Sequence, residues 1–402
     1  MKIFSPFKWY NKRQISTLSI LQYFYLLTIG IDHAELKSKV RVYIDGCFDL
    51  MHAGHFNSFR QAKKLGDVLV LGINSDEEVE AVKGPTVFNG RERWIVAGAC
   101  KWVDEIIPDT IYTPTVELID KFSCDFYTHG DDIALNSEGI DSAAPLKEVG
   151  RFKLFKRTRG VSTTDIAAKL LKIKDDGLDT IHEDEEKECE DDSHKSKTYP
   201  KNLGAFNANP NFFGSAKRIA HFANTKEPLE TDRIVYVDGC FDICHPGHIE
   251  QLKKARELGD FLIVGIHDDL TINQYVGKQF PLNALHERVL NILSCKYVDD
   301  VIIGAPFKIT ERLLKDLNIS IVVKSLEVMQ GSVRSEALAL NPYEIPEKYE
   351  LLREVSVECP ITMKEIATRA VKNKEAMQRK ILKYSARQDE FESKPSLVQE
   401  IS

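Results

Sequence analysis

The chain carries one long stretch of sequence twice. Residues 43–78 align without a gap to residues 236–271, and two histidines of the first copy fall on two histidines of the second. The two copies begin 193 positions apart (43 and 236), which exceeds the unit of a solenoid array, so the repeat predicts two whole domains of one fold. Each copy combines an apolar strand, a tight turn with the pattern H-x-G-H, and a helix. The sequence therefore predicts a nucleotide-phosphate site that is built twice.

The length of 402 residues accommodates two ordinary domains and a linker. Short apolar runs alternate with helical patterns in both copies, which is typical of a parallel sheet covered by helices. We therefore predict the α/β class, with two tandem Rossmann-like, doubly wound parallel-sheet domains whose ligands bind at the carboxyl ends of strands. The predicted parts are an N-terminal extension with an apolar segment (1–39), a catalytic domain (40–173), an acidic linker (174–230), a second, partly degenerate domain (231–371) and a charged tail (372–402).

In the first copy the pattern predicts strands at 40–44, 68–73, 103–107 and 152–156, and helices at 55–65, 91–102, 115–121 and 166–173. Lys83 is expected in a loop between the second strand and the next helix. The charged tail is expected to form a solvated helix that frays.

Acidic residues gather in the linker. Residues 175–192 hold eleven acidic residues and one lysine, while the whole chain has a formal net charge of -7. An acidic run with few apolar residues predicts a solvated, disordered linker. The sequence has no basic tract with interleaved aromatic residues, so nucleic acid is not an expected partner.

The eight cysteines are scattered, and no C-x-x-C pair occurs. Cys47 and Cys240 occupy matching positions of the two copies, as do Cys100 and Cys295. This pattern favours small buried residues that stay reduced over a disulfide framework or a zinc site, so no metal site is predicted. Reduced cysteines in turn indicate a cytoplasmic catalytic region.

Residues 15–31 are apolar and follow Lys8, Lys12 and Arg13. This segment resembles a signal anchor or an interfacial helix, but it is slightly short for a spanning helix and Gln22 dilutes it. A span with its basic end in the cytosol would place the catalytic region in the lumen, against the reduced cysteines. Two interpretations stay open: a peripheral membrane helix, which would associate the chain with the cytosolic face of the endoplasmic reticulum, and an extension that packs on the protein or is disordered.

The pattern H-x-G-H begins a predicted helix. His52 and His55 can direct both rings at one phosphate chain, and Gly54 lets the backbone approach closely. The helix N-terminus adds unpaired N–H groups and the positive end of the helix dipole. The two histidines are therefore candidates for a reaction that develops negative charge on oxygens bound to phosphorus.

Two further segments offer cations. Lys83 stands beside Gly84, and from a loop its ammonium can reach the β- and γ-phosphates of a nucleotide. Residues 157–164 combine a guanidinium, a glycine turn, hydroxyl groups and a helix start within one loop. An ordinary capped helix start would not explain Arg157 or the paired threonines, so this loop is a candidate phosphate clamp.

These motifs resemble the cytidylyltransferase family of nucleotidyltransferases. The resemblance rests on G-x-F-D-x-x-H-x-G-H at 46–55 and R-T-x-G-x-S-T-T at 157–164, with K-G at 83–84, E-R at 92–93 and W-V-D-E at 102–105 between them. It covers most of the first copy and, more weakly, the second. Members that act on choline phosphate or glycerol phosphate have one catalytic domain, whereas two tandem domains resemble the members that act on ethanolamine phosphate.

The resemblance implies that CTP and ethanolamine phosphate are substrates, and that CDP-ethanolamine and pyrophosphate are formed for phosphatidylethanolamine biosynthesis. The substrate phosphate would attack the α-phosphate in line, without a covalent enzyme intermediate. Mg²⁺ is expected to arrive with CTP, and no organic cofactor is expected. The alternatives are a CTP-dependent transferase for choline phosphate or a polyol phosphate, and a non-catalytic nucleotide-binding or scaffold role, chiefly for the second domain. Tyr112 and Trp94 are candidates for the ammonium pocket.

The resemblance also assigns roles to residues. Asp131 would face the cytosine or its ribose, and Arg93 would lie near the nucleotide or the second substrate. The residues expected to act on the reacting phosphates are His52, His55, Lys83 and Arg157. The expected CTP-binding residues are Gly46, Cys47, Phe48, Asp49, Gly54, Arg93, Gly130, Asp131, Thr158, Gly160, Ser162 and Thr163.

The second copy keeps the entrance pattern but departs from the family elsewhere. In the alignment of the two copies, Val276 occupies the position of Lys83, although Lys278 follows two residues later. Val357 occupies the position of Arg157. We predict that the first domain is the main catalytic site, and that the second is a weakened nucleotide site or a structural partner. The two copies would form an internal pseudo-dimer, or the chain a homodimer. The nucleotide contacts expected in the second copy are Gly239, Cys240, Phe241, Asp242, His245, Gly247, His248, Lys278 and Arg288.

Overall fold

The computed structural model describes residues 39–132, 141–173, 216–224, 226–277, 279–325, 340–359, 361–396 and 398–401. Arg41–Ser402 form one unit. The apolar segment 15–31, the acidic run 175–192 and Lys278 lie outside the described residues. Within the described part, no helix has both the length and the apolar character needed to cross a membrane.

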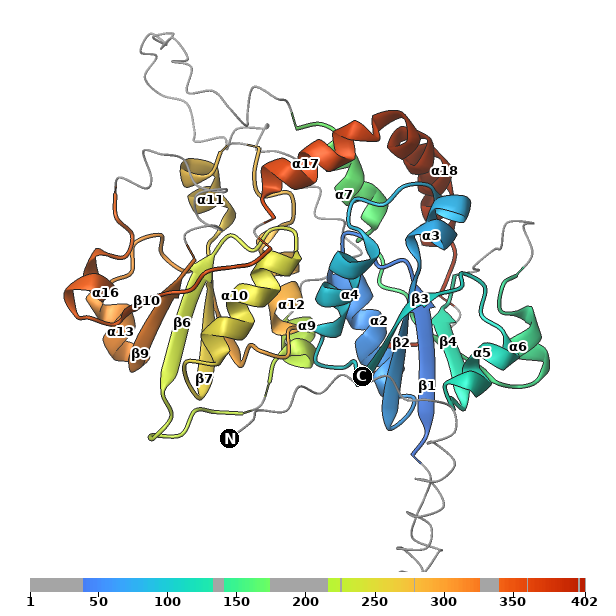
Figure 1. Cartoon of the computed structure of the whole chain (residues 1–402), viewed down its shortest axis with the longest axis horizontal. Helices are drawn as coiled ribbons and strands as arrows, with labels where there is room; N and C mark the ends of the chain where they lie inside the picture. Colours follow the sequence, from blue (N-terminus) through green and yellow to red (C-terminus); the bar gives the residue numbers. More distant parts are fainter. Residues whose placement is uncertain are drawn as a thin grey trace, which may run out of the picture. The chain divides into compact units, whose positions relative to one another are not determined.

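The first copy forms a five-stranded, all-parallel sheet in the order β3-β2-β1-β4-β5 (Figure 1). The chain runs from β1 outward to β3 and then returns to β4 on the other side of β1. The carboxyl ends of β1 and β4 therefore flank the switch point at which such sheets bind ligands. The strands are β1 (Arg41–Gly46), β2 (Val68–Asn74), β3 (Glu105–Thr110), β4 (Phe126–Gly130) and β5 (Phe152–Phe155).

Helices follow the strands, as the alternating pattern predicts. They are α2 (Ala53–Lys63), α3 (Asp76–Lys83), α4 (Gly90–Gly98), α5 (Val116–Lys121), α6 (Ala144–Glu148) and α7 (Thr163–Leu170). The prediction of a loop at Lys83 was wrong, because Lys83 is the last residue of α3. Ser75 caps this helix by accepting from the Glu78 N–H at 3.2 Å, and Gly84 ends it with φ at 83°. Both signals stand in the sequence.

The second copy repeats this architecture with the order β10-β9-β6-β7-β8, so the predicted pair of Rossmann-like α/β domains is confirmed. Its strands are β6 (Ile234–Gly239), β7 (Phe261–Ile266), β8 (Asp300–Ile303), β9 (Ile319–Lys324) and β10 (Leu352–Glu354). Its helices are α10 (Pro246–Arg256), α11 (Asp269–Tyr275), α12 (Leu285–Leu293), α13 (Glu311–Asp316), α16 (Glu344–Lys348) and α17 (Met363–Lys372), and α9 (Ala216–Phe222) precedes them.

Contacts between the two copies come in matching pairs. The Lys101 N–H donates to the Ser294 carbonyl at 2.9 Å, and the Lys296 N–H donates to the Ala99 carbonyl at 2.8 Å. These bonds flank an antiparallel bridge between Cys100 and Cys295, which occupy the same position in their copies. Helix α4 of the first copy contacts α10 of the second, and α12 contacts α2 in the same way. The two domains therefore meet with a local two-fold relation.

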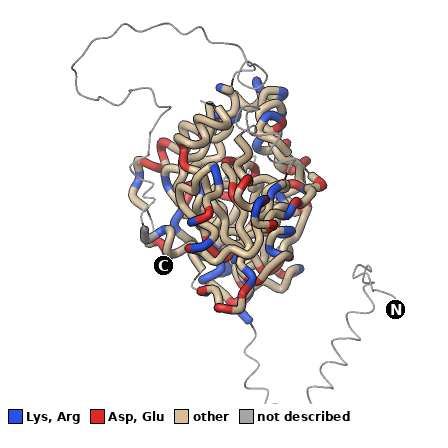
Figure 2. The backbone as a smooth tube through the Cα atoms, turned by 90° about the vertical axis from the view of Figure 1, so that its left-hand side faces the viewer, with Lys and Arg blue, Asp and Glu red and all other residues tan. Residues whose placement is uncertain are grey.

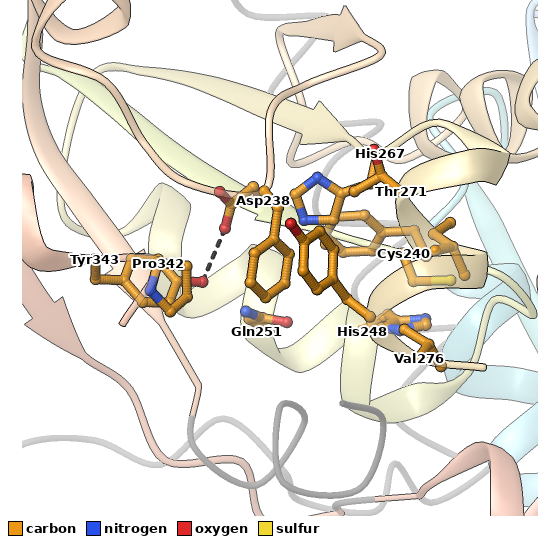
Figure 3. Close-up of a pocket in the computed structure, with 14 residues that line it drawn as sticks. Asp238, Cys240, His248, Gln251, His267, Thr271, Val276, Pro342 and Tyr343 are labelled. Carbon is orange, nitrogen blue, oxygen red and sulfur yellow. Dashed lines mark hydrogen bonds between the residues drawn. The ribbon is translucent and has the colours of Figure 1, made fainter. Parts of the chain in front are cut away.

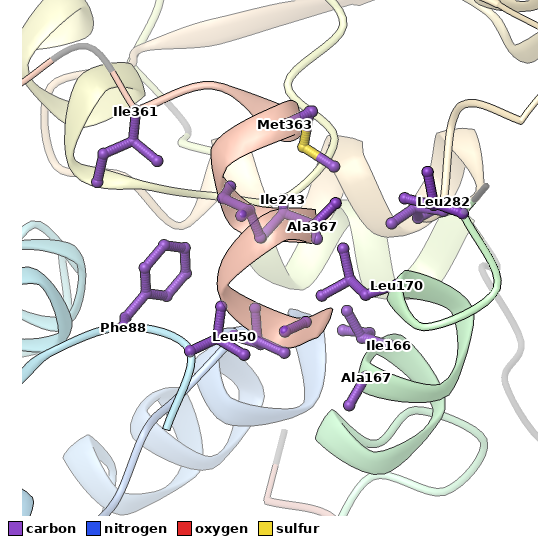
Figure 4. Packing of buried hydrophobic residues seen from close by; sticks show 14 of the residues in the cluster. Leu50, Phe88, Ile166, Ala167, Leu170, Ile243, Leu282, Ile361, Met363 and Ala367 are labelled. Atoms are coloured by element: carbon purple, nitrogen blue, oxygen red, sulfur yellow. The ribbon is translucent and has the colours of Figure 1, made fainter. Parts of the chain in front are cut away.

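A shared apolar core joins the copies behind their entrance loops (Figure 4). Leu50 and Ile243 lie in the two H-x-G-H entrance loops, and both side chains are fully buried in this cluster. Helices α7 and α17 supply further members. The labelled residues of the core are Leu50, Phe88, Ile166, Ala167, Leu170, Ile243, Leu282, Ile361, Met363 and Ala367. The loops that shape each site thus depend on packing against the other domain.

The tail forms α18 (Lys374–Ser393), and it is more than the solvated helix that the sequence suggests. Met377 is buried in the shared core, and other residues of the helix contact the first domain. At the other end of the second domain, Phe222 of α9 is buried and packs edge-on against Trp102, with 5.1 Å between the ring centroids. Part of the predicted linker is therefore a packed helix.

Candidate active site

The histidine pair lies at the N-terminus of α2. His52 is the N-cap residue, and its Nδ1 accepts from the Gly54 N–H at 3.1 Å. The rings of His52 and His55 stack with 4.0 Å between their centroids. A Cβ atom on Gly54 would lie 2.8 Å from the His52 ring, so glycine is required for the ring to fold back onto the helix end.

Both histidines are neutral near pH 7. Burial, followed by the charges of His55 and Arg157, holds the pKa of His52 well below its ordinary value. Burial, followed by the charges of Arg157 and Lys83, lowers the pKa of His55 to about 3. His55 Nδ1 is buried and has no hydrogen-bond partner among the described residues. The four residues predicted to act on phosphate therefore influence one another electrostatically at one place.

The entrance loop is held in a strained backbone conformation. Phe48 has φ at 51°, and its ring packs against Gly46, where a Cβ atom would lie 2.9 Å from it. The same ring contacts His55 edge-on at 5.6 Å between centroids. The Asp49 carboxylate accepts from the N–H groups of Val87 and Phe88 at 2.9 and 3.0 Å. Gly46, Phe48 and Asp49 thus shape the loop.

Lys83 reaches the site from the end of α3. Its ammonium lies 5.3 Å from the centroid of the Tyr112 ring, a distance that suits a cation–π contact. Burial lowers the pKa of Lys83, but the combined opposite effect of its neighbours Tyr112, Cys47 and Tyr384 is larger. The pKa is therefore raised above its ordinary value, and the lysine carries its positive charge. Tyr112, a candidate for the headgroup pocket, therefore already faces one cation. Trp94 is 40% exposed on α4.

Asp45 is a buried carboxylate at the carboxyl end of β1, and the sequence reasoning missed it. Its Oδ1 accepts from the Tyr127 hydroxyl at 3.0 Å. Its Oδ2 is buried and has no hydrogen bond of ordinary geometry. Asn74 nevertheless lies near enough to lower the pKa of the carboxyl group. Burial raises the pKa of Asp45 to about 7, and Lys83 is among the groups that oppose this rise. A bound cation could therefore pair with the Oδ2 atom of Asp45.

Arg93 is fully buried and serves the loops around the site. Its guanidinium donates to the carbonyls of Cys47 and Asn74 at 2.5 and 2.8 Å, and to the Asp76 carboxylate at 2.8 Å. These bonds connect the ends of β1 and β2. Arg93 and the Cys47 carbonyl thus lie beneath the site, where their bond holds the backbone of the loop after β1 in position.

The clamp loop follows β5 and contacts the residues that follow β4. Arg157 donates to the Asp132 carboxylate at 2.8 Å, and the Arg157 N–H donates to the Asp131 carboxylate at the same distance. Asp131 follows Gly130, the last residue of β4. Asp131 and Gly130 therefore lie at the sheet's switch point, and Arg157 reaches the site in a fixed orientation.

The remaining clamp residues connect this loop to the entrance. The Thr158 hydroxyl accepts from Asn57 of α2 at 2.9 Å, and the Thr163 hydroxyl donates to the Asp49 carbonyl at 3.3 Å. Ser162 caps α7 by accepting from an N–H at 3.2 Å. Gly160 has φ at 78°, which a residue with a side chain would adopt only with strain. The two predicted motifs are thus joined directly.

The C-terminal tail completes the wall of this site, and the sequence reasoning missed it. Gln388 accepts from the Arg157 guanidinium at 2.8 Å, and Glu392 accepts from the Gly160 N–H at 3.2 Å. The Phe391 ring lies 5.1 Å from the Arg157 guanidinium. Beyond the helix, the Ser396 hydroxyl donates to the Asp131 carboxylate. A pattern of apolar and charged residues alone does not indicate which surface such a tail contacts.

The second copy keeps the entrance geometry. His245 caps α10, and its ring stacks on that of His248 with 3.6 Å between centroids. Burial lowers the pKa of His248 to about 3. Asp242 accepts from two backbone N–H groups, as Asp49 does. The neighbouring Gly239, Cys240, Phe241, Gly247 and the buried Arg288 repeat their counterparts of the first copy.

In the described part of the second copy, the clamp of the first copy is not repeated. Val357 is buried where Arg157 projects, and Val276 stands at the end of α11 in the place of Lys83. Thr362 caps α17 as Ser162 caps α7. Lys278 lies outside the described residues, so the structure gives no account of it.

A ready-made metal cage is not found in the described part of either copy. Among the described residues, no group of three or more His, Cys, Asp or Glu side chains could hold a metal ion. Acidic and basic residues are intermingled along the described backbone (Figure 2).

Comparisons with known proteins agree with this architecture. The family model of cytidylyltransferase-like proteins matches residues 43–169 and 236–379. The ethanolamine-phosphate cytidylyltransferase of Dictyostelium discoideum is 40% identical over 369 residues, which cover 89% of this chain and 96% of that protein. The protein of the same name from Arabidopsis thaliana is 40% identical and covers 90% of this chain and 87% of its own length. That of Mus musculus is 34% identical, with coverages of 88% and 90%. The chain therefore belongs to the family of the ethanolamine-phosphate cytidylyltransferases.

Proposed function

We propose that this chain transfers the cytidylyl group of CTP to ethanolamine phosphate and releases pyrophosphate. The supporting observation is the convergence of two neutral histidines with Lys83 and Arg157 at the N-terminus of α2. Such an array suits a reaction in which negative charge grows on phosphate oxygens. The names of the relatives support the choice of substrates.

In the proposed reaction, a phosphate oxygen of ethanolamine phosphate attacks the α-phosphorus of CTP. The new phosphorus–oxygen bond forms as the bond to the bridging oxygen breaks, and pyrophosphate leaves with that electron pair. His52 and His55 donate N–H groups to the reacting phosphates, while Lys83 and Arg157 balance the growing charge. No side chain forms a covalent intermediate.

The other predicted nucleotide residues fall into two groups in this proposal. Gly130 and Asp131, at the switch point, lie on the side assigned to the cytidine, whereas Thr158, Gly160, Ser162 and Thr163 lie on the side of the triphosphate. The entrance residues and Arg93 act by positioning backbone, because the Asp49 carboxylate and both terminal nitrogens of Arg93 already bind protein. Mg²⁺ would be held by triphosphate oxygens and water, which is its usual preference at nucleotides.

We further assign the ammonium headgroup to Asp45. Its Oδ2 is a buried acceptor, and an ionised carboxylate attracts a substrate ammonium more strongly than a neutral one. With a pKa of about 7 in the free protein, the carboxylate gains charge as the pH rises from 6 to 8. The kcat/KM for ethanolamine phosphate should therefore rise through this range, and Asp45→Asn should remove that rise. A rise of equal size in the variant would show that another group is responsible.

The test of the proposed function measures pyrophosphate release by the full chain with CTP and Mg²⁺. Ethanolamine phosphate and choline phosphate are compared as acceptors at equal concentration. Preference for ethanolamine phosphate supports the proposal. Preference for choline phosphate would support cytidylyl transfer from CTP but show that ethanolamine phosphate is not the preferred acceptor. The absence of turnover with either acceptor would contradict both parts of the proposal.

The proposal includes a cytoplasmic location for the catalytic domains. Cys47, Cys100 and Cys295 are buried free thiols, which suits a reducing compartment. An interfacial role for residues 15–31 at the cytosolic face of the endoplasmic reticulum belongs to the same proposal. Fractionation of cells that express the chain with and without residues 1–35 would test this role, and unchanged membrane association would overturn it.

A further inference from the structure

The second domain contains a pocket at the carboxyl end of β6 (Figure 3). Its cavity volume is about 70 Å³. The pocket lies between the entrance loop and α11, at the place where the first domain has its active site. None of the described residues that line it is Lys or Arg.

The corresponding place in the first domain holds a built-in cation. There the Lys83 ammonium lies over the Tyr112 ring and lowers the pKa of Asp45. In the second copy, Val276 replaces the lysine, while Phe307 keeps the aromatic position of Tyr112. A second ring, Tyr275, stacks on Phe307 with 3.9 Å between centroids. The second copy thus exchanges an aromatic–lysine pair for a pair of aromatic rings.

Two acceptors of this pocket have no donor among the described residues. Asp238 matches Asp45, and its Oδ1 accepts from the Tyr343 hydroxyl at 2.8 Å (Figure 3). Its Oδ2 is buried without a partner, and so is Gln251 Oε1. These side chains are 8% and 4% exposed, and both residues line the pocket. Buried acceptors of this kind favour a ligand that donates hydrogen bonds.

We propose that the second domain binds a small organic ammonium ion that carries no phosphate. A carboxylate oxygen, an amide oxygen and aromatic faces are the groups that hold an alkylammonium. Two of the cations that would balance a phosphate are replaced by valines, at 276 and 357. Ethanolamine itself is the smallest ligand of this class that is related to the proposed substrate. The site would therefore sense free amine beside an active site that uses its phosphate ester.

The test uses the full chain and ligand-observed saturation-transfer NMR with ethanolamine as the probe. Ethanolamine should give a signal that Asp238→Asn weakens about tenfold or more, because a buried charge partner is lost. Val276→Lys, which copies Lys83, should weaken the signal, because a nearby charge of the same sign repels the ammonium ligand. Asp300→Asn, at an exposed carboxylate of β8, is the matched control and should leave the signal unchanged.

The outcomes separate this site from the first domain. Persistence of the signal in both Asp238→Asn and Val276→Lys would overturn the proposal, as would loss of the signal in Asp45→Asn alone. Displacement of ethanolamine by CTP in the His52→Asn variant would indicate a nucleotide pocket instead. If ethanolamine binds only after Lys278→Ala, that lysine fills the pocket and the proposal fails. Turnover with ethanolamine phosphate is measured separately, so failure of the proposed function gives a different result.

Discussion

The guanidinium of Arg157 donates to the side-chain oxygen of Gln388 at 2.8 Å, although the two residues are 231 positions apart. The bond joins the clamp of the first domain to the helix that ends the second. The Lys380 ammonium makes a similar connection by donating to the Pro85 carbonyl at 3.1 Å, close to Lys83. Helix α18 therefore spans the two cationic segments of the first site.

Removing Arg157 should abolish most of the activity, whereas removing Gln388 should reduce it only moderately. Arg157→Ala is expected to lower kcat by about 100-fold or more, the usual loss for a preorganised charge at a transition state. Gln388→Ala should lower kcat by about threefold to tenfold, because the guanidinium loses one of its orienting partners. Steady-state kinetics checks both values, and Arg379→Ala, on the exposed side of α18, is the control. Equal losses in Gln388→Ala and Arg379→Ala would contradict a specific contact.

Matched substitutions should affect the two histidine pairs differently. His55→Asn is expected to lower kcat by about 100-fold or more, because the N–H donor beside Lys83 and Arg157 is displaced. The loss of kcat in His248→Asn should be smaller than that in His55→Asn by about tenfold or more, since Val276 and Val357 replace those cations in its domain. The comparison measures pyrophosphate release at saturating substrates. Equal losses would show that the second copy takes part in the chemistry.

The stability of the chain should gain from Asp45→Asn, and the gain should depend on pH. The pKa of this carboxyl is about 7 in the folded protein and 3.8 as its ordinary value. Between these values the folded state holds a proton that the unfolded chain releases, so the stability present at low pH is lost as the pH rises through 7. The neutral amide avoids this loss, so the increase in Tm should be larger at pH 8 than at pH 5. Thermal unfolding of both proteins at the two pH values decides the sign.

The shared core should couple the two domains in unfolding. Leu170 is fully buried there, and Leu170→Ala is expected to cost about 2–5 kcal/mol. Leu382→Ala is the control, because Leu382 is 73% exposed on α18 and should change stability by less than about 0.5 kcal/mol. Denaturant unfolding is followed with probes in each domain. Separate transitions, with only the first shifted by Leu170→Ala, would show that the domains unfold independently.

Local patterns in the sequence predict the entrance of the site well. The strand, the H-x-G-H turn and the helix depend on residues close in the chain, and His52 and Gly54 lie as that pattern predicts. The helix that ends at Lys83 was predictable too, from Ser75 and Gly84. The role of Asp45 was not predictable. The burial of this strand residue and the missing hydrogen-bond partner of its Oδ2 become visible only in the three-dimensional structure. The contacts of Gln388 join distant segments, and no local rule specifies them.

The reciprocal hydrogen bonds around Cys100 and Cys295 bear on how such a chain can change over time. Two identical single-domain subunits could form the same isologous contact. In that arrangement every mutation appears in both subunits at once, so neither could lose a phosphate-binding lysine while the other kept it. Within one continuous chain, selection acts on each half separately. The interface can then persist unchanged while one half retains Lys83 and the other drifts to Val276 and a different ligand.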